Sequence, residues 1–292
     1  MGIIKPIKTS PIVGLVGKKS SKKSTPKQFG NFAGKPKERP SWVKVALNLG
    51  MEADQPLWNE PSKFFRVSGI GNPCIRSMVF SALGHNVPFE AKTLRIFAVG
   101  TSIGEIVANT FKKRGVLIDA EKTVVLDFPP IRGRYDIKVE GQDDDEGEEI
   151  LGEVKSINDF GFDKLPEEHD YVLASESPLI DTYRHYVMQW NTYAQLEGLE
   201  KGFIIFEAKN TQRHKVYFLR TDAALYDEVI DKTTFGAKYL LEERIPPIPK
   251  ERSPHGNDPV CNKCSAKYLC ELVARDGDTL ENVKNIDKQV RG

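Results

Sequence analysis

Residues 131–157 read IRGRYDIKVEGQDDDEGEEILGEVKSI, with apolar and polar residues alternating on both sides of a polar, glycine-containing loop. Such alternation is typical of β-strands, and the loop residues favour a turn. The stretch therefore predicts a β-hairpin with strands Ile131–Glu140 and Glu149–Ile157. The acidic loop resembles a cation site in composition, but runs of charge are more often solvated surface, so we assign no metal to it.

Two carboxylates and a lysine come together in this predicted hairpin. Side chains alternate across a strand, so Glu153 and Lys155 share one face while Val154 points to the other. Strand pairing can bring Asp136 beside them. Carboxylates are suitable ligands for Mg²⁺ or Mn²⁺, which would polarise a phosphoryl group and acidify a bound water that Lys155 orients. The pattern indicates phosphodiester hydrolysis, and a surface salt bridge is the alternative that the Glu-x-Lys tripeptide alone leaves open.

Further helices and strands are predicted on both sides of the hairpin from start and stop signals and hydrophobic periodicity. Their order indicates an α/β domain with a mixed sheet. The predicted helices are Pro73–Leu83, Thr93–Arg114, Pro178–Glu197 and Thr221–Glu243. The other predicted strands are Gly202–Ala208, Lys215–Leu219 and one or two strands within Val116–Phe128, around a turn at Asp119–Glu121; residues 158–177 are expected to form a loop or a broken helix.

The predicted helix Pro178–Glu197 carries a polar and aromatic stripe. His185, Gln189 and Tyr193 recur every four residues, which keeps them on one face of the helix. We therefore expect Gln189 and Tyr193 to reach a phosphate or a metal-bound water. His185 is equally consistent with a structural role.

The four cysteines suggest a second metal centre. Cys261, Cys264 and Cys270 form a C-x₂-C-x₅-C cluster, and Cys74 lies 187 residues before it. Four thiolates suit an iron–sulfur cluster or a structural zinc. Zinc could recruit His255 in place of Cys74, and Cys74 could instead be a small buried core residue.

Composition and charge restrict the class of protein. The chain has 292 residues, of which 39% are hydrophobic, and no apolar run approaches the ~18 residues of a membrane span. Four cysteines are too few for a disulfide scaffold, which favours a reducing, intracellular (cytoplasmic) compartment. Residues 1–40 hold ten Lys and Arg against one acidic residue, and the remaining 32 basic and 40 acidic residues give −8. Such a basic arm often attracts nucleic acid, and a solubilising tail is the alternative.

Taken together, these motifs resemble the RecB-type nucleases of the PD-(D/E)xK superfamily, in the branch of the CRISPR-associated iron–sulfur exonucleases and the AddB nuclease domain. The resemblance covers roughly residues 65–275. Asp136 matches the first metal carboxylate of the family and residues 153–155 match its Glu-x-Lys. Gln189 and Tyr193 match its Gln-x₃-Tyr motif. The order of one early cysteine and three late ones is also the same, and residues 72–76 resemble the segment around the first cysteine.

The resemblance implies a restriction-endonuclease-like α/β core with a mixed central sheet flanked by helices, and a C-terminal cysteine-rich iron–sulfur segment. It implies a structural [4Fe–4S] cluster on the four cysteines and a Mg²⁺ or Mn²⁺ site made by Asp136, Glu153 and the Val154 carbonyl. One departure is Gly104, which stands where the family commonly has a metal-binding histidine; the neighbouring Glu105 is the candidate ligand there.

Three segments and three functions are therefore expected. The segments are a basic, disordered arm (1–40), a nuclease core (41–250) and a C-terminal iron–sulfur segment with a tail (251–292). The leading function is a metal-dependent DNA exonuclease acting on ends or single strands in recombination, repair, or phage or CRISPR DNA processing, with recombination or replication proteins as possible partners. The alternatives are a catalytically silent nuclease-like module that binds DNA or a partner, and a zinc-stapled interaction protein.

Overall fold

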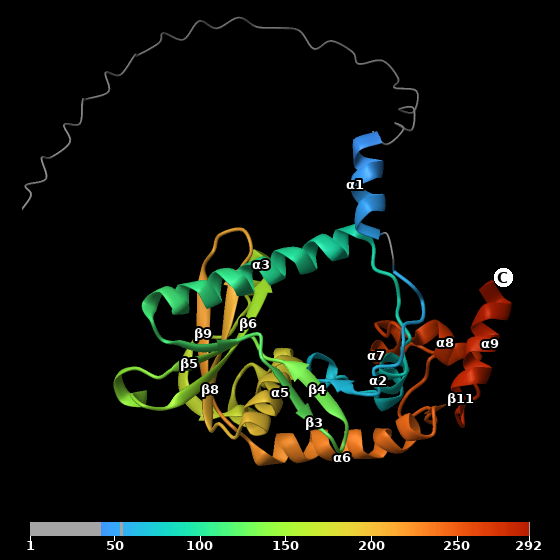
Figure 1. The fold of residues 1–292 in the computed structure, drawn as a ribbon. Coiled ribbons are helices and arrows are strands. Elements are labelled where there is room, and N and C mark those ends of the chain that lie inside the picture. Colours follow the sequence, from blue (N-terminus) through green and yellow to red (C-terminus); the bar gives the residue numbers. More distant parts are fainter. Residues whose placement is uncertain (1–41, 53–54, 292) are drawn as a thin grey trace, which may run out of the picture. The chain divides into compact units, whose positions relative to one another are not determined.

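A six-stranded mixed sheet is the centre of the computed structural model, which describes residues 42–52 and 55–291 (Figure 1). The order of its strands is β2-β5-β6-β8-β9-β7, in which β6 pairs with β8 and β7 with β9 in parallel and the other pairs are antiparallel. These strands are β2 (Leu117–Ala120), β5 (Ile137–Glu140), β6 (Glu149–Ile157), β7 (His169–Leu173), β8 (Lys201–Ala208) and β9 (His214–Arg220). The predicted basic arm lies outside the described residues.

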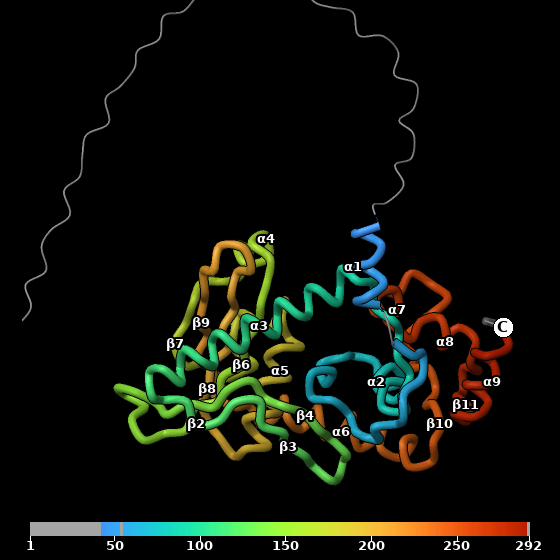
Figure 2. The backbone as a smooth tube through the Cα atoms, turned by 45° about the horizontal axis from the view of Figure 1, so that its top comes forward, coloured from blue at the N-terminus to red at the C-terminus, as the bar shows by residue number. Residues whose placement is uncertain are grey.

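Helices lie on both faces of this sheet (Figures 1 and 2). The long helix α3 crosses one face in contact with β2 and β6, and α5 packs on the other face against β6 and β8. The helices are α1 (Trp42–Glu52), α2 (Ile75–Ala82), α3 (Ala91–Arg114), α4 (Asp159–Phe162), α5 (Ile180–Glu197), α6 (Ala223–Leu241), α7 (Pro259–Asn262), α8 (Lys267–Leu272) and α9 (Leu280–Arg291). The four predicted helices are therefore present, with ends shifted by at most two residues, and the mixed α/β fold is confirmed.

A second, three-stranded sheet has the order β1-β4-β3, with β1 (Phe65–Arg66), β3 (Thr123–Leu126) and β4 (Ile131–Arg134). The prediction of one strand over Ile131–Glu140 is therefore wrong, because β4 and β5 belong to different sheets. The chain changes sheets at Tyr135 and Asp136, since Gly133 packs against the Tyr193 ring and β4 pairs with β1 and β3 instead. The acidic hairpin between β5 and β6 is confirmed.

Two small features complete the described part. A two-stranded sheet joins β10 (Arg244–Ile245) to β11 (Asp278–Thr279), and β7 is a strand where the sequence predicted a loop or a broken helix. Among the described strands β7 pairs only with β9, at the edge of the sheet, so it carries little of the apolar pattern that marks an inner strand. Residues 251–291 pack with the preceding residues in one unit that begins at Trp42.

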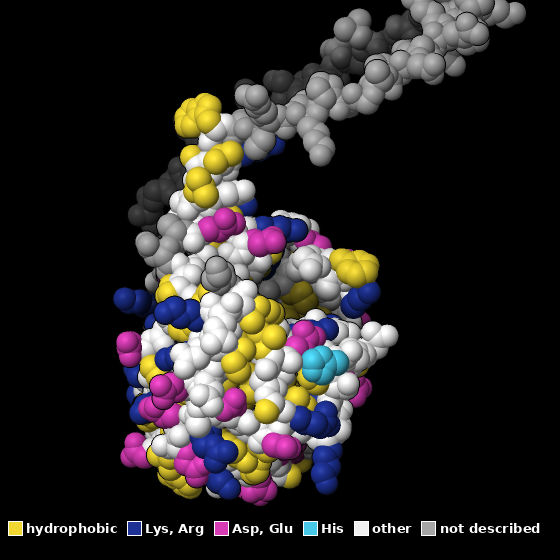
Figure 3. Space-filling view, turned by 90° about the vertical axis from the view of Figure 1, so that its right-hand side faces the viewer, with side chains coloured by type: hydrophobic (Ala, Val, Ile, Leu, Met, Phe, Trp, Pro, Cys, Tyr) yellow, Lys and Arg dark blue, Asp and Glu magenta, His cyan; other side chains and the backbone are white. Residues whose placement is uncertain are grey.

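The core lies mainly between the sheet and the helices α2, α5 and α6. Its largest buried side chains include Trp190, Tyr193, Phe206 and Tyr217. By contrast, α1 has no buried residue, and its hydrophobic side chains gather on the surface (Figure 3). No helix of the described residues is long and apolar enough to cross a membrane.

Two glycines inside α3 differ in the space around them, which gives a matched prediction. A Cβ at Gly104 would meet nothing within 4 Å, whereas a Cβ at Gly100 would lie 3.2 Å from Ser156 Oγ. Gly104→Ala is therefore expected to raise the free energy of unfolding by about 0.5–1 kcal/mol, because Ala is the better helix former. Gly100→Ala is expected to raise the free energy of unfolding by less, because its Cβ would crowd Ser156 Oγ. Urea unfolding of both variants measures the free energy of unfolding. Equal increases for the two variants would show that the contact with Ser156 does not oppose a side chain at Gly100.

Asp222 at the start of α6 predicts a pH-dependent contribution to stability. Its Oδ1 accepts hydrogen bonds from the backbone N–H groups of Ala224 (2.8 Å) and Leu225 (3.3 Å). Burial alone would raise the pKa of Asp222, but hydrogen bonds from Ser175 and from these backbone groups outweigh it and lower the pKa. The folded pKa is thus below the unfolded value of about 3.9, so the carboxylate stabilises the fold above about pH 4 and this contribution is lost as the pH falls through the folded pKa.

Asp222→Ala is expected to lower the free energy of unfolding by about 0.5–2 kcal/mol at pH 7. The difference from wild type should shrink as the pH falls below about 4, because the wild-type carboxylate then becomes protonated. Asp222→Asn is the control, since it keeps an acceptor for the cap without a titrating group. A difference that stayed constant from pH 7 to pH 3 would contradict the role given to the charge.

Candidate functional site

Asp136 and Glu153 meet where the two sheets join. Asp136 directly precedes β5, and Ile137 of β5 is paired with Gly152 of β6, next to Glu153. The Asp136 Oδ2 atom accepts a hydrogen bond of 2.7 Å from the backbone N–H of Val154. The strand pairing and this bond hold the two carboxyl groups side by side, as the sequence predicted.

Glu153 is buried, with 1% of its surface exposed. Its Oε1 atom contacts Lys155 Nζ at 2.5 Å and accepts a hydrogen bond of 2.7 Å from Gln189 Nε2. Its Oε2 atom is buried without a hydrogen-bond partner among the described residues. Burial, and then the charge of Asp136, raise the pKa of Glu153 to about 8 against the opposing effect of Lys155. Burial likewise raises the pKa of Asp136.

Lys155 and Gln189 complete this group. Lys155 Nζ donates a hydrogen bond of 3.1 Å to Gln189 Oε1 and lies 4.7 Å from the centre of the Tyr186 ring. Gln189 thus bridges Glu153 and Lys155 through the two ends of its amide. A residue that contacts both charged groups fixes their positions, and this is the role that the geometry gives to Gln189.

Tyr193 lies one turn further along α5 and has a different role. It is buried, and its hydroxyl accepts a hydrogen bond of 3.1 Å from the backbone N–H of Arg134. Tyr193 therefore holds the end of β4 in place just before Asp136. The third member of the predicted stripe, His185, packs its ring against that of Tyr186, with 3.9 Å between ring centres.

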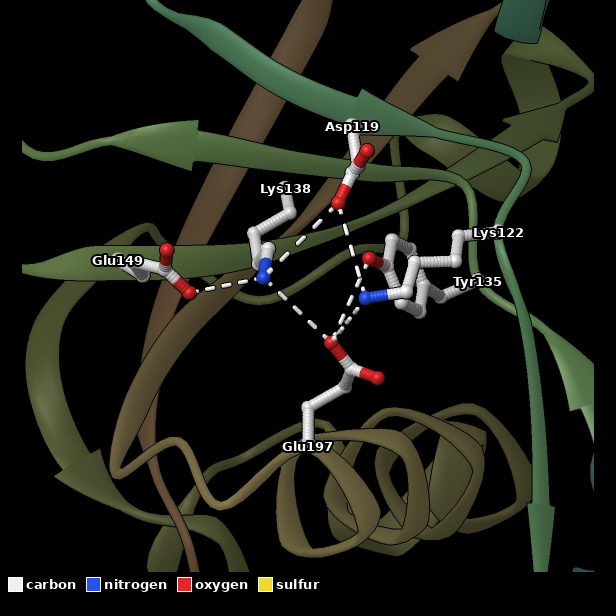
Figure 4. A network of polar contacts seen from close by, with 6 residues as sticks. All are labelled: Asp119, Lys122, Tyr135, Lys138, Glu149 and Glu197. Atoms are coloured by element: carbon white, nitrogen blue, oxygen red, sulfur yellow. Dashed lines mark hydrogen bonds and ion pairs between the residues drawn. The ribbon is translucent and has the colours of Figure 1, made fainter.

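The stripe continues to Glu197, which the sequence analysis did not single out (Figure 4). Glu197 Oε2 lies 3.5 Å from Lys138 Nζ and 3.3 Å from Lys122 Nζ, and Lys138 Nζ also contacts Glu149 Oε2 at 2.8 Å. Lys138 belongs to β5, two residues after Asp136. One face of α5 thus contacts β4, β5 and β6 near the two carboxylates.

A cleft of about 1020 Å³ opens over Asp136, Glu153 and Lys155. Basic side chains on its walls are accompanied by the partly exposed aromatic ring of Phe97 from α3. These basic residues, besides Lys155, are Arg66, Arg132, Arg134 and Lys209. Arg66 and Arg132 are strand partners in β1 and β4, so their backbones lie side by side.

Glu121 is a third carboxylate of the cleft that the sequence analysis missed. It follows β2 with a left-handed backbone (φ 55°), and its carboxylate contacts Arg134 Nε at 2.5 Å. Burial raises the pKa of Glu121 against the effect of Arg134, and Asp136 and Glu105 add to the rise. The only signal in the sequence was its place in the predicted turn. Glu121 lies beside Asp136 because β2 pairs with β5, and its backbone N–H donates a hydrogen bond of 3.0 Å to the Asp136 carbonyl oxygen.

Glu105 and Gly104 lie on α3 on the other side of the cleft. Gly104 lines the cleft, whereas the exposed Glu105 is not among the lining residues. The structure therefore brings Asp136, Glu153, Val154 and Lys155 together with Gln189 and Tyr193. Glu105 does not line the cleft, but it is close enough to Glu121 to raise the pKa of that residue. The ligand role of Glu105 stays a prediction.

The four cysteines line a second, separate pocket, so residues 187 positions apart in the sequence come together there. All four are free thiols, and burial raises the pKa values of Cys74, Cys261 and Cys270. His255 is not among the lining residues. Across residues 42–52 and 55–291, no three or more His, Cys, Asp or Glu side chains are arranged so that they could hold a metal ion.

Comparisons with known proteins give a likeness of fold. No protein-family model matches the sequence, and no curated protein matches it. The solved structure of SSO0001 is 15% identical, covers 78% of this chain and 96% of its own, and has a TM-score of 0.42.

Two exonucleases are similar to the same degree. The alkaline exonuclease LHK-Exo from Laribacter hongkongensis is 12% identical, covers 62% of this chain and 89% of its own, and has a TM-score of 0.43. A phage-related exonuclease from Haemophilus somnus 129PT is 16% identical, covers 61% and 93%, and has a TM-score of 0.42. At these TM-scores the likeness supports no statement about the activity of this chain.

Proposed function

We propose that this chain is a metal-dependent deoxyribonuclease of the PD-(D/E)xK kind, acting on DNA ends or single strands. The observation that carries the proposal is the meeting of Asp136 and Glu153 beside Lys155, with Glu153 Oε2 buried and unpartnered. A buried polar atom without a partner costs about 1–3 kcal/mol, and more when charged. An arrangement of this cost is typical of a functional site.

The donor set fits a hard divalent cation. Two neighbouring carboxylates repel each other when both are charged, and oxygen ligands suit Mg²⁺ or Mn²⁺. Asp136 and Glu153 would hold the ion, with the Val154 carbonyl and Glu105 as further candidate ligands. The ion would supply charge neutralisation at the phosphate and a more acidic water.

The protein groups around the ion would each act at a defined place. Lys155 lines the cleft and donates hydrogen bonds to Glu153 and Gln189, and it would orient the attacking water or stabilise charge on the phosphate. Gln189 holds Lys155 against Glu153, and Tyr193 holds the segment before Asp136. Both are positioning residues in this proposal.

The residues that line the cleft are suited to binding a nucleic-acid strand. Arg66, Arg132 and Lys209 offer positive charge to phosphates, and the half-exposed ring of Phe97 offers a surface on which a base can stack. The cleft is thus basic although the body of the chain carries a net negative charge.

For the cysteine pocket we propose a structural [4Fe–4S] cluster, with zinc as the alternative. Four soft thiols line one pocket, which favours iron–sulfur or zinc over a hard cation. Such a group would link α2, which begins after Cys74, to the C-terminal segment with α7 and α8. Recombination, repair, or phage or CRISPR DNA processing, with proteins of those pathways as partners, would be the setting for such an enzyme.

A silent DNA- or partner-binding module is the second candidate. It is favoured by the absence of an imidazole at Gly104 and by the place of Glu105 outside the cleft lining. The two candidates share the basic cleft and differ in turnover, so one assay separates them.

The deciding experiment is digestion of DNA that is labelled at the 5′ or the 3′ end. Linear single strands, blunt duplexes and circular single strands would each be incubated with Mg²⁺, Mn²⁺ or a chelator. The proposal expects short products from linear DNA with either metal and none with the chelator. DNA binding without any cleavage would favour the silent module, and neither binding nor cleavage would exclude both.

Arg132 provides a prediction for the basic wall. If Arg132 contacts a phosphate, Arg132→Ala is expected to weaken DNA binding and to reduce the slope of log Kd against log salt by about 1. Binding would be measured by fluorescence anisotropy in Ca²⁺ at several salt concentrations. Arg244→Ala is the matched control, because Arg244 is exposed on β10 and is not among the residues that line the cleft. Equal slopes for the two variants would remove Arg132 from the phosphate contacts.

A further inference from the structure

Arg76 is a fully buried cation without a carboxylate partner within hydrogen-bond reach in the described residues. It is 0% exposed and lies in α2, two residues after Cys74. Its Nη1 and Nη2 atoms donate hydrogen bonds to the backbone carbonyls of Pro246 (2.6 Å) and Ala274 (3.3 Å). Its Nε atom is buried and has no partner among the described residues. Neutral carbonyls leave the charge of a buried guanidinium uncompensated, which is costly.

Arg252 shares one of these features, an unpartnered buried Nε, although it is only partly buried and has a carboxylate neighbour. Its Nη1 atom lies 3.6 Å from Asp258 Oδ2, and its Nε atom is also buried without a partner. Arg76 and Arg252 both line the pocket of the four cysteines. Of the four unpartnered buried side-chain atoms among the described residues, two are therefore guanidinium donors of this one pocket. A negatively charged acceptor in this pocket would give both unpartnered Nε–H groups a hydrogen-bond partner.

We propose that Arg76 and Arg252 are the charge partners and hydrogen-bond donors of a metal–thiolate group held by the four cysteines. This inference rests on the cluster proposed above. Thiolates around a zinc ion or an iron–sulfur cluster leave a net negative charge and sulfur acceptors, and outer hydrogen bonds of this kind stabilise such groups and set their reduction potentials. Neither arginine ligates the metal; each acts on it through the sulfur atoms.

The test must separate this role from a structural one, because Arg76 also holds two backbone carbonyls. The variants Arg252→Gln, Arg252→Lys, Arg76→Gln and Arg76→Lys of the full chain would be loaded without oxygen with Fe²⁺ and sulfide, or with Zn²⁺ alone. The readouts are the midpoint potential of the iron-loaded protein and the rate at which a chelator removes the metal. Arg244→Gln is the matched control, because Arg244 is exposed in the same region and does not line the pocket.

The glutamine variants are expected to show a more negative midpoint potential, since a nearby positive charge favours the reduced cluster. They are expected to release metal about tenfold faster or more, as is usual when an outer hydrogen bond to a metal ligand is removed. The lysine variants should recover most of the potential, which a purely structural role would not predict. Arg244→Gln should behave as wild type.

Wild-type potential and wild-type release rates in fully loaded Arg252→Gln and Arg76→Gln would overturn the inference. If Arg76→Gln does not fold, Arg252→Gln decides alone. If the protein takes up zinc and not iron, faster zinc release supports the inference and unchanged release overturns it. A wild-type chain that binds neither metal overturns the inference together with the cluster, whereas the nuclease proposal is judged separately by cleavage in Mg²⁺.

Discussion

Asp136→Asn is expected to reduce DNA cleavage by about a thousandfold or more, because it removes one of the two carboxylates that would hold the catalytic ion. The fold should persist, since Asn can still accept the hydrogen bond from the backbone N–H of Val154. Removing a like charge beside the buried Glu153 should also keep the metal-free protein at least as stable as wild type. The measurements are single-turnover cleavage of end-labelled DNA and thermal unfolding in a chelator.

The same loss of cleavage is expected for Glu153→Gln and Lys155→Ala, whose side chains contact each other. Asp127→Asn is the control for Asp136→Asn, because Asp127 is exposed after β3 and does not line the cleft. If well-folded Asp136→Asn cleaves DNA at a rate near that of wild type, Asp136 is not part of the catalytic site. If Asp127→Asn loses as much activity, the effect is not specific to the cleft.

The group of Asp136, Glu153 and Lys155 could be predicted from the sequence because its determinants are local. The acidic loop fixes the hairpin, and the alternation of side chains places Glu153 and Lys155 on one face. The spacing of four residues then places Gln189 and Tyr193 on one face of a helix. These patterns depend only on residues close together in the sequence. In the structure Gln189 lies beside Glu153 and Lys155 and bonds both.

The division of Ile131–Glu140 between two sheets could not be predicted in the same way. The alternation of apolar residues continues through the break, so local pattern indicates a single strand. The break depends on Tyr193, which is about 60 positions away in sequence and packs on Gly133 while bonding Arg134. Glu121 lies beside Asp136 through the pairing of β2 with β5, in which its backbone N–H donates a hydrogen bond of 3.0 Å to the Asp136 carbonyl oxygen, whereas its local sequence indicates only a turn.

The two candidate centres also differ in what the sequence reveals. The spacing of three cysteines is a local signal, and the structure brings Cys74 into the same pocket. The unpartnered donors of Arg76 and Arg252 have no local signal, because an arginine in a sequence does not show where its guanidinium is buried. Their roles therefore become visible only once α2 and the C-terminal segment are packed together.

Cys74→Ser is the variant with the largest expected effect on stability. If Cys74 is a ligand, the variant should lose bound iron or zinc, and metal-binding free energy is folding free energy. Structural zinc contributes about 10–16 kcal/mol in small domains, so a loss of even a third of this would lower the melting temperature by roughly 10 °C or more. Metal content by elemental analysis and thermal unfolding of the purified protein measure the two effects.

The control is the wild-type chain stripped of metal. Replacing one buried sulfur by oxygen in the absence of a cluster alters a single small side chain, so stripped wild type and stripped Cys74→Ser should melt within a few degrees of each other. The large difference should exist only between the loaded proteins, because only there does the thiolate bind a metal. A Cys74→Ser variant that keeps its full metal content and its melting temperature would show that Cys74 is a buried core residue and that the metal, if bound, uses the C-terminal cysteines without it.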